Sequence, residues 1–107
     1  MTSPVSPPLF YKTLVPFSSI EHRSLTLPKA PGSYAFASFT DIIPLLVSEV
    51  THAVRHYPIV FIKDQASSAV TMVALVGKGD GKNQFVGADG QWRQGVYVPA
   101  WVRRYPF

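Results

Sequence analysis

Residues 77–82 are the stretch whose composition most directly invites chemistry. They read Gly77-Lys78-Gly79-Asp80-Gly81-Lys82, and glycines of this kind can let backbone amides approach a phosphate. A phosphate-binding loop also needs a Lys followed by Ser or Thr, and then a helix whose N-terminus faces the anion. Here Lys82 is followed by Asn83 and a strand-like run. The sequence therefore favours a hairpin connection made of ordinary turn residues.

His52 and His56 are spaced four residues apart, which would place both imidazoles on one face of a helix. A zinc site of this kind needs a third ligand and usually the glutamate of an H-E-x-x-H motif. The intervening residues here are Ala53, Val54 and Arg55, and a cation beside the imidazoles disfavours a metal. The pair is interpreted as favourable charge near a helix C-terminus. No metal ligand is assigned.

Ser48 and Glu49 lie close to His52 and share residue types with hydrolases that use a nucleophilic serine. Such serines usually sit on a strained turn in a G-x-S-x-G motif, which this sequence lacks. The three side chains are interpreted as part of a solvated helix face. The sequence therefore predicts no catalytic residue and no cofactor.

Residues 96–107 contain four aromatic residues and two adjacent arginines. Stacking aromatics combined with arginines can hold single-stranded nucleic acid. The favoured interpretation places the aromatics in a core or an interface and the arginine stems over apolar surface, since no wider basic groove is evident. With two aromatic residues near the N-terminus, the candidate partner interface comprises Phe10, Tyr11, Trp101, Arg103, Arg104, Tyr105 and Phe107.

Residues 1–33 are predicted to form an extended, proline-rich arm. Prolines remove backbone donors and favour extended conformations in the residues before them. The six in this segment are Pro4, Pro7, Pro8, Pro16, Pro28 and Pro31. The segment also contains Leu9, Phe10 and Phe17, which makes it too apolar for a free tail. We expect the arm to lie over its own domain or over a neighbouring protein.

An amphipathic helix is predicted over about 42–56, after a short strand over 34–39. Apolar residues follow helical spacing, and Pro44 falls in the first turn, where its missing donor costs little. The face expected to pack on the strands carries Leu46, Val47, Val50 and Val54. Pro58 ends the helix.

Strands are predicted over 59–62 and 69–76, joined by a connection over 65–68. Their continuous apolar character suggests burial on both faces. Further strands are expected at 84–86 and 96–98, with a turn at Asp89-Gly90. The predicted fold class is α+β, an antiparallel β-meander with one amphipathic helix packed on a face. Residues 34–107 would form this domain.

Composition bounds the class of protein. The chain has 107 residues, 47% of them hydrophobic and 15% charged, which is typical of one folded domain with some apolar surface. Cysteine is absent and the net charge is +4, with the basic residues dispersed. The N-terminus has no signal-peptide pattern, and no apolar run approaches the roughly 20 residues of a membrane span. We therefore expect a soluble cytoplasmic protein, with peripheral association to a membrane complex left open.

Three stretches together resemble the SapC family. They are Tyr11–Pro16, Tyr57–Phe61, and the tract from Asn83 to Phe107 with its R-R-Y-P-F ending. Family members typically continue past that ending, so the resemblance implies that this chain is a fragment, a truncated gene product or a short variant of the family's domain. It also implies an association with bacterial surface-layer or envelope-export loci. It supplies no catalytic residues.

The leading functional hypothesis is a non-enzymatic binding or accessory protein of a bacterial envelope or other multisubunit system. Its expected partner is another protein or a second copy of the chain, without nucleic acid. One alternative is an enzyme whose active site is completed by a missing half or by another subunit. A weaker alternative is a basic protein that binds single-stranded nucleic acid.

Overall fold

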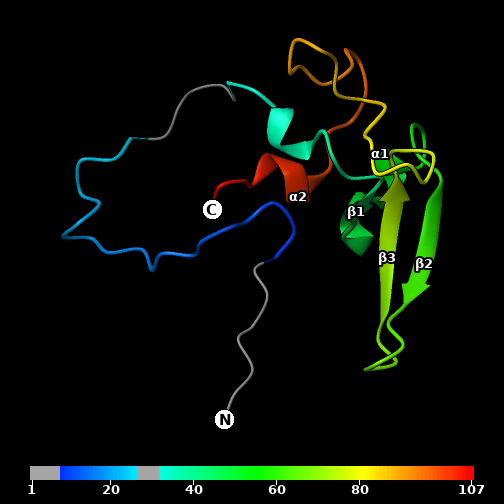
Figure 1. Ribbon diagram of the computed structural model, residues 1–107, viewed down its shortest axis with the longest axis horizontal. Coiled ribbons are helices and arrows are strands. Elements are labelled where there is room, and N and C mark those ends of the chain that lie inside the picture. Colours follow the sequence, from blue (N-terminus) through cyan, green and yellow to red (C-terminus); the bar gives the residue numbers. More distant parts are fainter. Residues whose placement is uncertain (1–7, 27–31) are drawn as a thin grey trace.

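The computed structural model describes residues 8–26 and 32–107. Residues 8–26 form turns and irregular chain without a helix or strand. The remaining elements are the 3₁₀ turn η1 (Ala35–Ala37), β1 (Ile42–Pro44), the 3₁₀ turn η2 (Val47–Glu49), α1 (Val50–Ala53), β2 (Ile59–Lys63), β3 (Val70–Leu75) and α2 (Ala100–Arg103) (Figure 1). The predicted α+β class with an antiparallel sheet is confirmed.

The sheet has three strands in the order β1-β3-β2, with β3 in the centre and antiparallel to both neighbours (Figure 1). β2 and β3 form a hairpin, which is closed at its turn by the Asp64 N–H donating to the Ala69 carbonyl at 2.8 Å. The predicted strands at 59–62 and 69–76 are therefore confirmed. Their predicted burial on both faces is wrong, since Phe61 and Val70 are exposed.

The predicted helix over 42–56 is wrong at its start, because Ile42–Pro44 is the strand β1. Ile43 lies opposite Ala74, and the Leu45 N–H donates to the Met72 carbonyl at 2.9 Å. In this register the nitrogen of Pro44 points away from β3, so its missing N–H leaves no gap in the ladder. β-branched Ile42 and Ile43 suit a strand equally well.

The buried face predicted for that helix is also wrong. Leu46 is 61% exposed, Val47 84% and Val54 59%, while Val50 is half-buried. The reason is that the chain turns after β1 into the short elements η2 and α1 rather than continuing one long helix. Ala53 faces the interior instead, being fully buried.

Three further predicted strands, over 34–39, 84–86 and 96–98, do not form in the described residues. Residues 34–39 form η1 rather than a strand, because the Ser33 hydroxyl accepts the Ala35 N–H at 3.0 Å and starts a tight turn. Residues 84–86 contribute one bridge, Val86 to Trp92, and 96–98 pair with no strand. The predicted turn at Asp89-Gly90 is present within that bridge.

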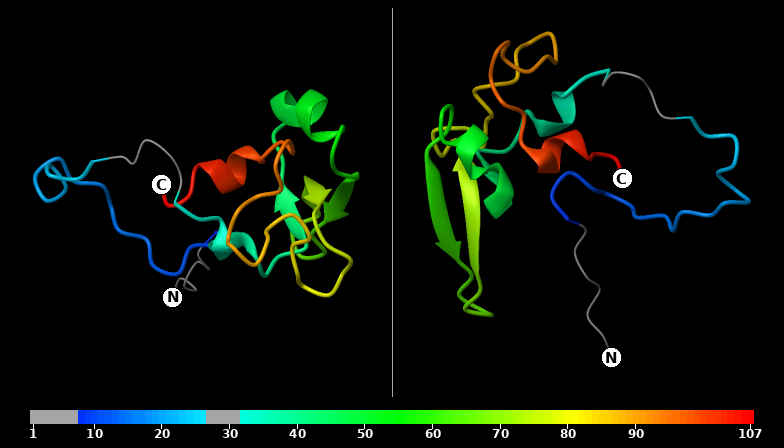
Figure 2. Two further views of the ribbon diagram at one scale, coloured as in Figure 1. Left: turned by 90° about the horizontal axis from the view of Figure 1, so that it is seen from above. Right: turned by 180° about the vertical axis from the view of Figure 1, so that it is seen from behind.

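The core lies between one face of the sheet and the C-terminal part of the chain (Figure 2). Ile43 of β1, Ala74 of β3 and Val76 supply the sheet side. Trp92 and Val102 cover it from the other side, with Val102 only 1% exposed. α2 therefore packs against β1, and Ala37 of η1 is buried in the same core, although these segments are far apart in sequence. No helix in the described part of the chain has the length and apolarity to cross a membrane.

The Gly77–Lys82 tract connects β3 to the Val86 bridge, as predicted, and no helix begins after it before α2. Gly77 has a packing role there. A β-carbon at this position would lie 2.1 Å from the Lys82 carbonyl oxygen and 2.7 Å from the β-carbon of Asp41. Glycine is therefore required at position 77, because two backbone segments approach each other closely there.

We predict that Ile43→Ala lowers the free energy of unfolding by about 2–5 kcal/mol, because it leaves a cavity at a fully buried site. The matched control is Leu46→Ala, which removes an exposed side chain three residues away and should change stability by less than about 1 kcal/mol. Urea denaturation measures both. Equal losses would contradict the strand register and support the helical face.

We also predict that Gly77→Ala destabilises the domain by about 1–3 kcal/mol, since the new methyl group meets backbone that cannot move away freely. Gly32→Ala is the control, because a β-carbon there meets nothing within 4 Å. Thermal unfolding monitored by circular dichroism compares the two variants. Identical melting temperatures would show that the connection can widen without cost.

Candidate partner-binding surface

An aromatic cluster joins the N-terminal segment to the C-terminus. The Phe10 ring lies edge-on to Phe36 at 5.2 Å and to Tyr105 at 6.4 Å. Phe36 of η1 stacks on Tyr105 at 4.2 Å, and Tyr11 lies 5.3 Å from Tyr105. These four residues, which we call the aromatic cluster, bring together segments nearly a whole chain apart. Such contacts add specific attraction to the apolar area they bury.

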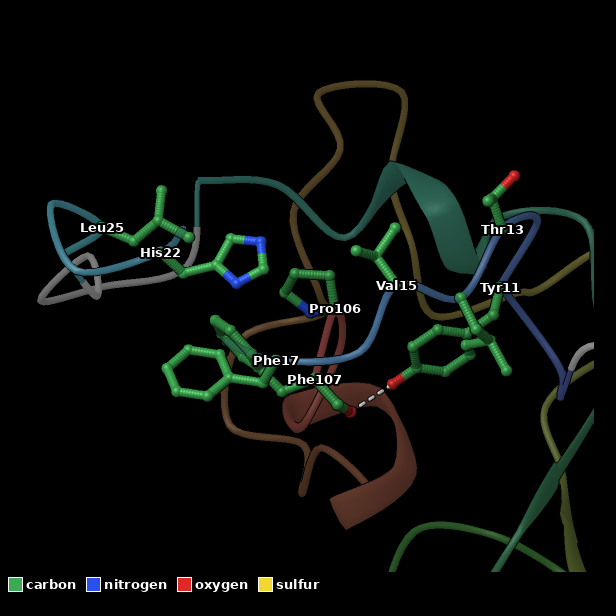
Figure 3. A pocket seen from close by; sticks show the side chains of 9 residues that line it. Tyr11, Thr13, Val15, Phe17, His22, Leu25, Pro106 and Phe107 are labelled. Carbon is green, nitrogen blue, oxygen red and sulfur yellow. Dashed lines mark hydrogen bonds between the residues drawn. The ribbon is translucent and has the colours of Figure 1, made fainter. Parts of the chain in front are cut away.

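Hydrogen bonds reinforce this junction. The Tyr11 hydroxyl donates to the Phe107 carbonyl at 2.5 Å (Figure 3). The Trp101 indole N–H donates to the Leu9 carbonyl at 3.4 Å. Phe10 has a φ of 79°, a left-handed conformation that bulky residues adopt only when their surroundings hold them. The packing of its ring in the aromatic cluster supplies that restraint.

The two adjacent arginines have different environments. The Arg104 guanidinium lies 3.9 Å from the Trp101 ring centroid and 5.7 Å from that of Tyr11, both within range of a cation–π interaction. Arg103 points elsewhere, donating to the Val98 carbonyl at 3.0 Å and to the Tyr97 hydroxyl at 3.1 Å. The structure thus gathers all the candidate interface residues except Arg103.

A groove of about 410 Å³ lies beside the aromatic cluster, between the N-terminal segment and the last two residues (Figure 3). Its lining is largely apolar and comprises Tyr11, Thr13, Leu14, Val15, Phe17, His22, Leu25, Pro106 and Phe107. The His22 ring stacks on Phe17 at 5.5 Å, and its Nδ1 accepts the Ser18 N–H at 2.9 Å. His22 is thereby oriented by a turn of its own segment.

The apolar side chains that line the groove are exposed to solvent. Phe17 is 77% exposed and Phe107 65%, and Leu14, Val15 and Leu25 are exposed as well. Trp101 and Tyr105 are half-buried. Sequence reasoning placed Phe107 and Tyr105 in the same candidate interface but did not include Phe17. The signal that could have indicated Phe17 is the group of apolar residues around it in a proline-rich segment.

The position of α2 depends on a buried carboxylate. Glu49 is only 5% exposed, and its Oε1 accepts the Ala100 N–H at 2.9 Å and the Tyr97 hydroxyl at 2.8 Å. Its Oε2 accepts the Leu46 N–H at 2.8 Å. Three donors therefore satisfy the charge, as burial of a carboxylate requires. Because Ala100 is the first residue of α2, Glu49 sets where this helix starts.

Two tyrosines extend the buried network. The Tyr57 hydroxyl donates to the Tyr97 carbonyl and accepts the Trp92 indole N–H at 3.0 Å. Burial raises the pKa of Tyr57 well above its usual value. Burial also raises the pKa of Tyr97, and the hydrogen bond to the Glu49 carboxylate acts in the same direction. Both hydroxyls are therefore protonated donors at neutral pH.

The sequence missed Glu49 and Tyr97. Glu49 was interpreted as part of a solvated face, yet it lies three residues after Leu46, where a glutamate commonly bonds the N–H at the start of a helix. Tyr97 is 48 residues from Glu49, so no local pattern links them.

The histidines proposed as a helical pair do not share a regular helix. α1 ends at Ala53, so His56 lies in the following turn. His52 instead stacks on Tyr97 at 5.5 Å. Within residues 8–26 and 32–107, no group of three His, Cys, Asp or Glu side chains is arranged to hold a metal ion.

We predict that Glu49→Gln destabilises the domain by about 1–3 kcal/mol, because the amide would turn an N–H toward a backbone N–H and lose the charge-assisted bonds. Glu21→Gln, at an exposed site, should change stability by less than about 0.5 kcal/mol. In a double-mutant cycle, Glu49→Gln and Tyr97→Phe should be non-additive by about 0.5 kcal/mol or more. Additive losses by urea denaturation would show that the two groups act independently.

One protein family matches most of this chain. The family model described as SapC matches residues 17–107, which include β1, β2, β3, α2 and most of the groove. No curated protein and no solved structure matches the chain. The family match covers far more than half of the sequence and includes two of the three stretches that resemble the family, Tyr57–Phe61 and the tract from Asn83 to Phe107. The chain therefore belongs to the SapC family.

Proposed function

We propose that this chain is a non-enzymatic accessory protein that binds a protein partner through the groove and the aromatic cluster beside it. The observation that carries the proposal is the exposed apolar lining of the groove. Aromatic and aliphatic side chains of this size are usually covered in a free-standing protein, and a contiguous exposed patch is typical of an interaction site. Phe17 and Phe107 are the most prominent of them.

The arrangement supports a protein partner rather than a small molecule. The groove is only partly enclosed, and its lining is largely apolar. Small-molecule sites usually enclose most of the ligand and converge several polar groups on it. Tyr11, Trp101 and Arg104 flank the groove, and these are the residue types enriched at the energetic centres of protein interfaces.

Charge further specifies the partner. The chain carries a net charge of +4, and the segments that form the groove and its flank expose Lys12, Arg23 and Arg104 against one carboxylate, Glu21. A partner that offers an apolar centre with carboxylates around it would be complementary in both respects. We therefore propose an acidic, apolar-centred protein surface as the ligand.

The family supplies the cellular setting of the proposal. The resemblance implies bacterial surface-layer or envelope-export systems, and we propose that the chain acts in the cytoplasm as an accessory part of such an assembly. In this view residues 1–33 are an interaction arm and residues 34–107 the domain that anchors it. Contacts of Phe10 and Tyr11 with the C-terminal residues support the arm's role in the surface.

Site-specific photocross-linking in the native cell tests the proposal. Benzoylphenylalanine replaces Phe17 in one variant and the equally exposed Val47, on η2, in the control. We expect one protein to cross-link from position 17 and not from position 47. The double variant Phe17→Ser, Phe107→Ser should weaken binding of that protein by about tenfold or more, since each ring contributes apolar contact area.

Three outcomes would contradict the proposal. Equal cross-linking from both positions would indicate unspecific contact. Recovery of nucleic acid alone, lost steeply as salt is raised, would favour a nucleic-acid binder. Binding of a small molecule in the groove, with turnover, would favour the enzyme alternative.

A further inference from the structure

β2 forms an open edge of the sheet. It is the last strand in the order β1-β3-β2, and in the described residues no backbone group pairs with its outer side. It also lies on the far side of the molecule from the groove and the C-terminus (Figures 1 and 2). This edge is therefore separate from the proposed partner-binding surface.

The register identifies which backbone groups are free. The Leu75 N–H donates to the Pro58 carbonyl at 3.0 Å, and the Asp64 N–H donates to the Ala69 carbonyl at 2.8 Å. Bonded pairs alternate in an antiparallel ladder, so Val60 and Ile62 also face β3. The N–H and C=O groups of the alternate residues, Ile59, Phe61 and Lys63, therefore point outward.

The two edges of the sheet differ in how they are protected. β1 has three residues, and Pro44 offers no N–H on its outer side. Short strands and prolines are common devices that prevent unwanted pairing at an edge. β2 has five residues and no proline, and Phe61 is 70% exposed at its centre. Only Lys63, at its end, carries a charge.

We propose that β2 pairs antiparallel with β2 of a second copy of this chain, on a two-fold axis at Phe61. Phe61 would then lie opposite Phe61 of the second copy, and Ile59 opposite its Lys63. The three outward N–H groups of each copy meet the three outward C=O groups of the other. The two sheets become one continuous six-stranded sheet.

Side chains favour this self-pairing, and charges do not oppose it. Directly opposite residues on one face of a sheet contact each other, so the two Phe61 rings cover one another. The two Lys63 residues lie four positions apart along the pairing, which separates them by roughly 13 Å at about 3.3 Å per residue. That exceeds the screening length of about 8 Å at physiological salt, so the lysines do not oppose the dimer. A two-fold contact is closed, so pairing the two β2 strands removes the open edge of both copies and the dimer does not grow further through β2.

Sedimentation velocity with charge-swapped variants tests the dimer. The wild-type chain should shift from monomer to dimer as its concentration rises toward the order of 1 mM. Phe61→Glu and Phe61→Lys should each stay monomeric, because like charges would meet at the axis. An equimolar mixture of the two should dimerise again, since opposite charges then face each other. Val47→Glu, also at an exposed apolar site, should dimerise like the wild type.

Single cysteines test the register, since the natural chain has none. Phe61→Cys should form an intermolecular disulfide on mild oxidation, because its α-carbon would lie about 5.5 Å from its counterpart. Ile59→Cys should not, because its counterpart lies roughly 13 Å away. Circular dichroism confirms that each variant is folded. A wild-type chain that remains monomeric throughout the series would overturn the proposal, as would a dimer that persists in both charged variants.

Discussion

The buried carboxylate of Glu49 is the constraint on which the arrangement of the C-terminal half depends. A charge removed from water is tolerated only when hydrogen bonds replace its hydration. The donors come from Leu46, from Tyr97 and from Ala100. The long connection that follows the sheet must therefore return to η2, and it does so with the Tyr97 backbone held by the Tyr57 hydroxyl.

The candidate partner-binding surface follows from that constraint. Because Glu49 sets the start of α2, Val102 enters the core while Trp101 turns toward the N-terminal segment. Arg104 then stacks on Trp101 beside Tyr11. The surface is thus presented by α2, a helix too short to be stable through its own hydrogen bonds alone. Its contacts with Glu49 and the core hold it in place. The open edge of β2 lies on the far side of the molecule from this surface. Pairing at that edge is therefore independent of the partner-binding surface.

Part of the fold could be predicted from local sequence. The β-branched runs that became β2 and β3 have few alternatives to strands, and the short polar connection between them favours a hairpin. The Asp89-Gly90 turn followed from residue type, since Gly90 adopts a positive φ. The aromatic and arginine residues near both ends indicated a candidate surface, and the structure brings most of them together. The motifs also indicated the family.

The antiparallel α+β class and the β2–β3 hairpin follow from short-range preferences, and the residue types available for binding are evident from the sequence. Tertiary structure decided that Ile43 belongs to a strand, since the spacing around it suits a helix as well and its partner, Ala74, is 31 positions away. It also decided that Glu49 is buried while Leu46 is exposed. A polar residue enters a core only when distant donors meet it, and no local periodicity specifies those donors.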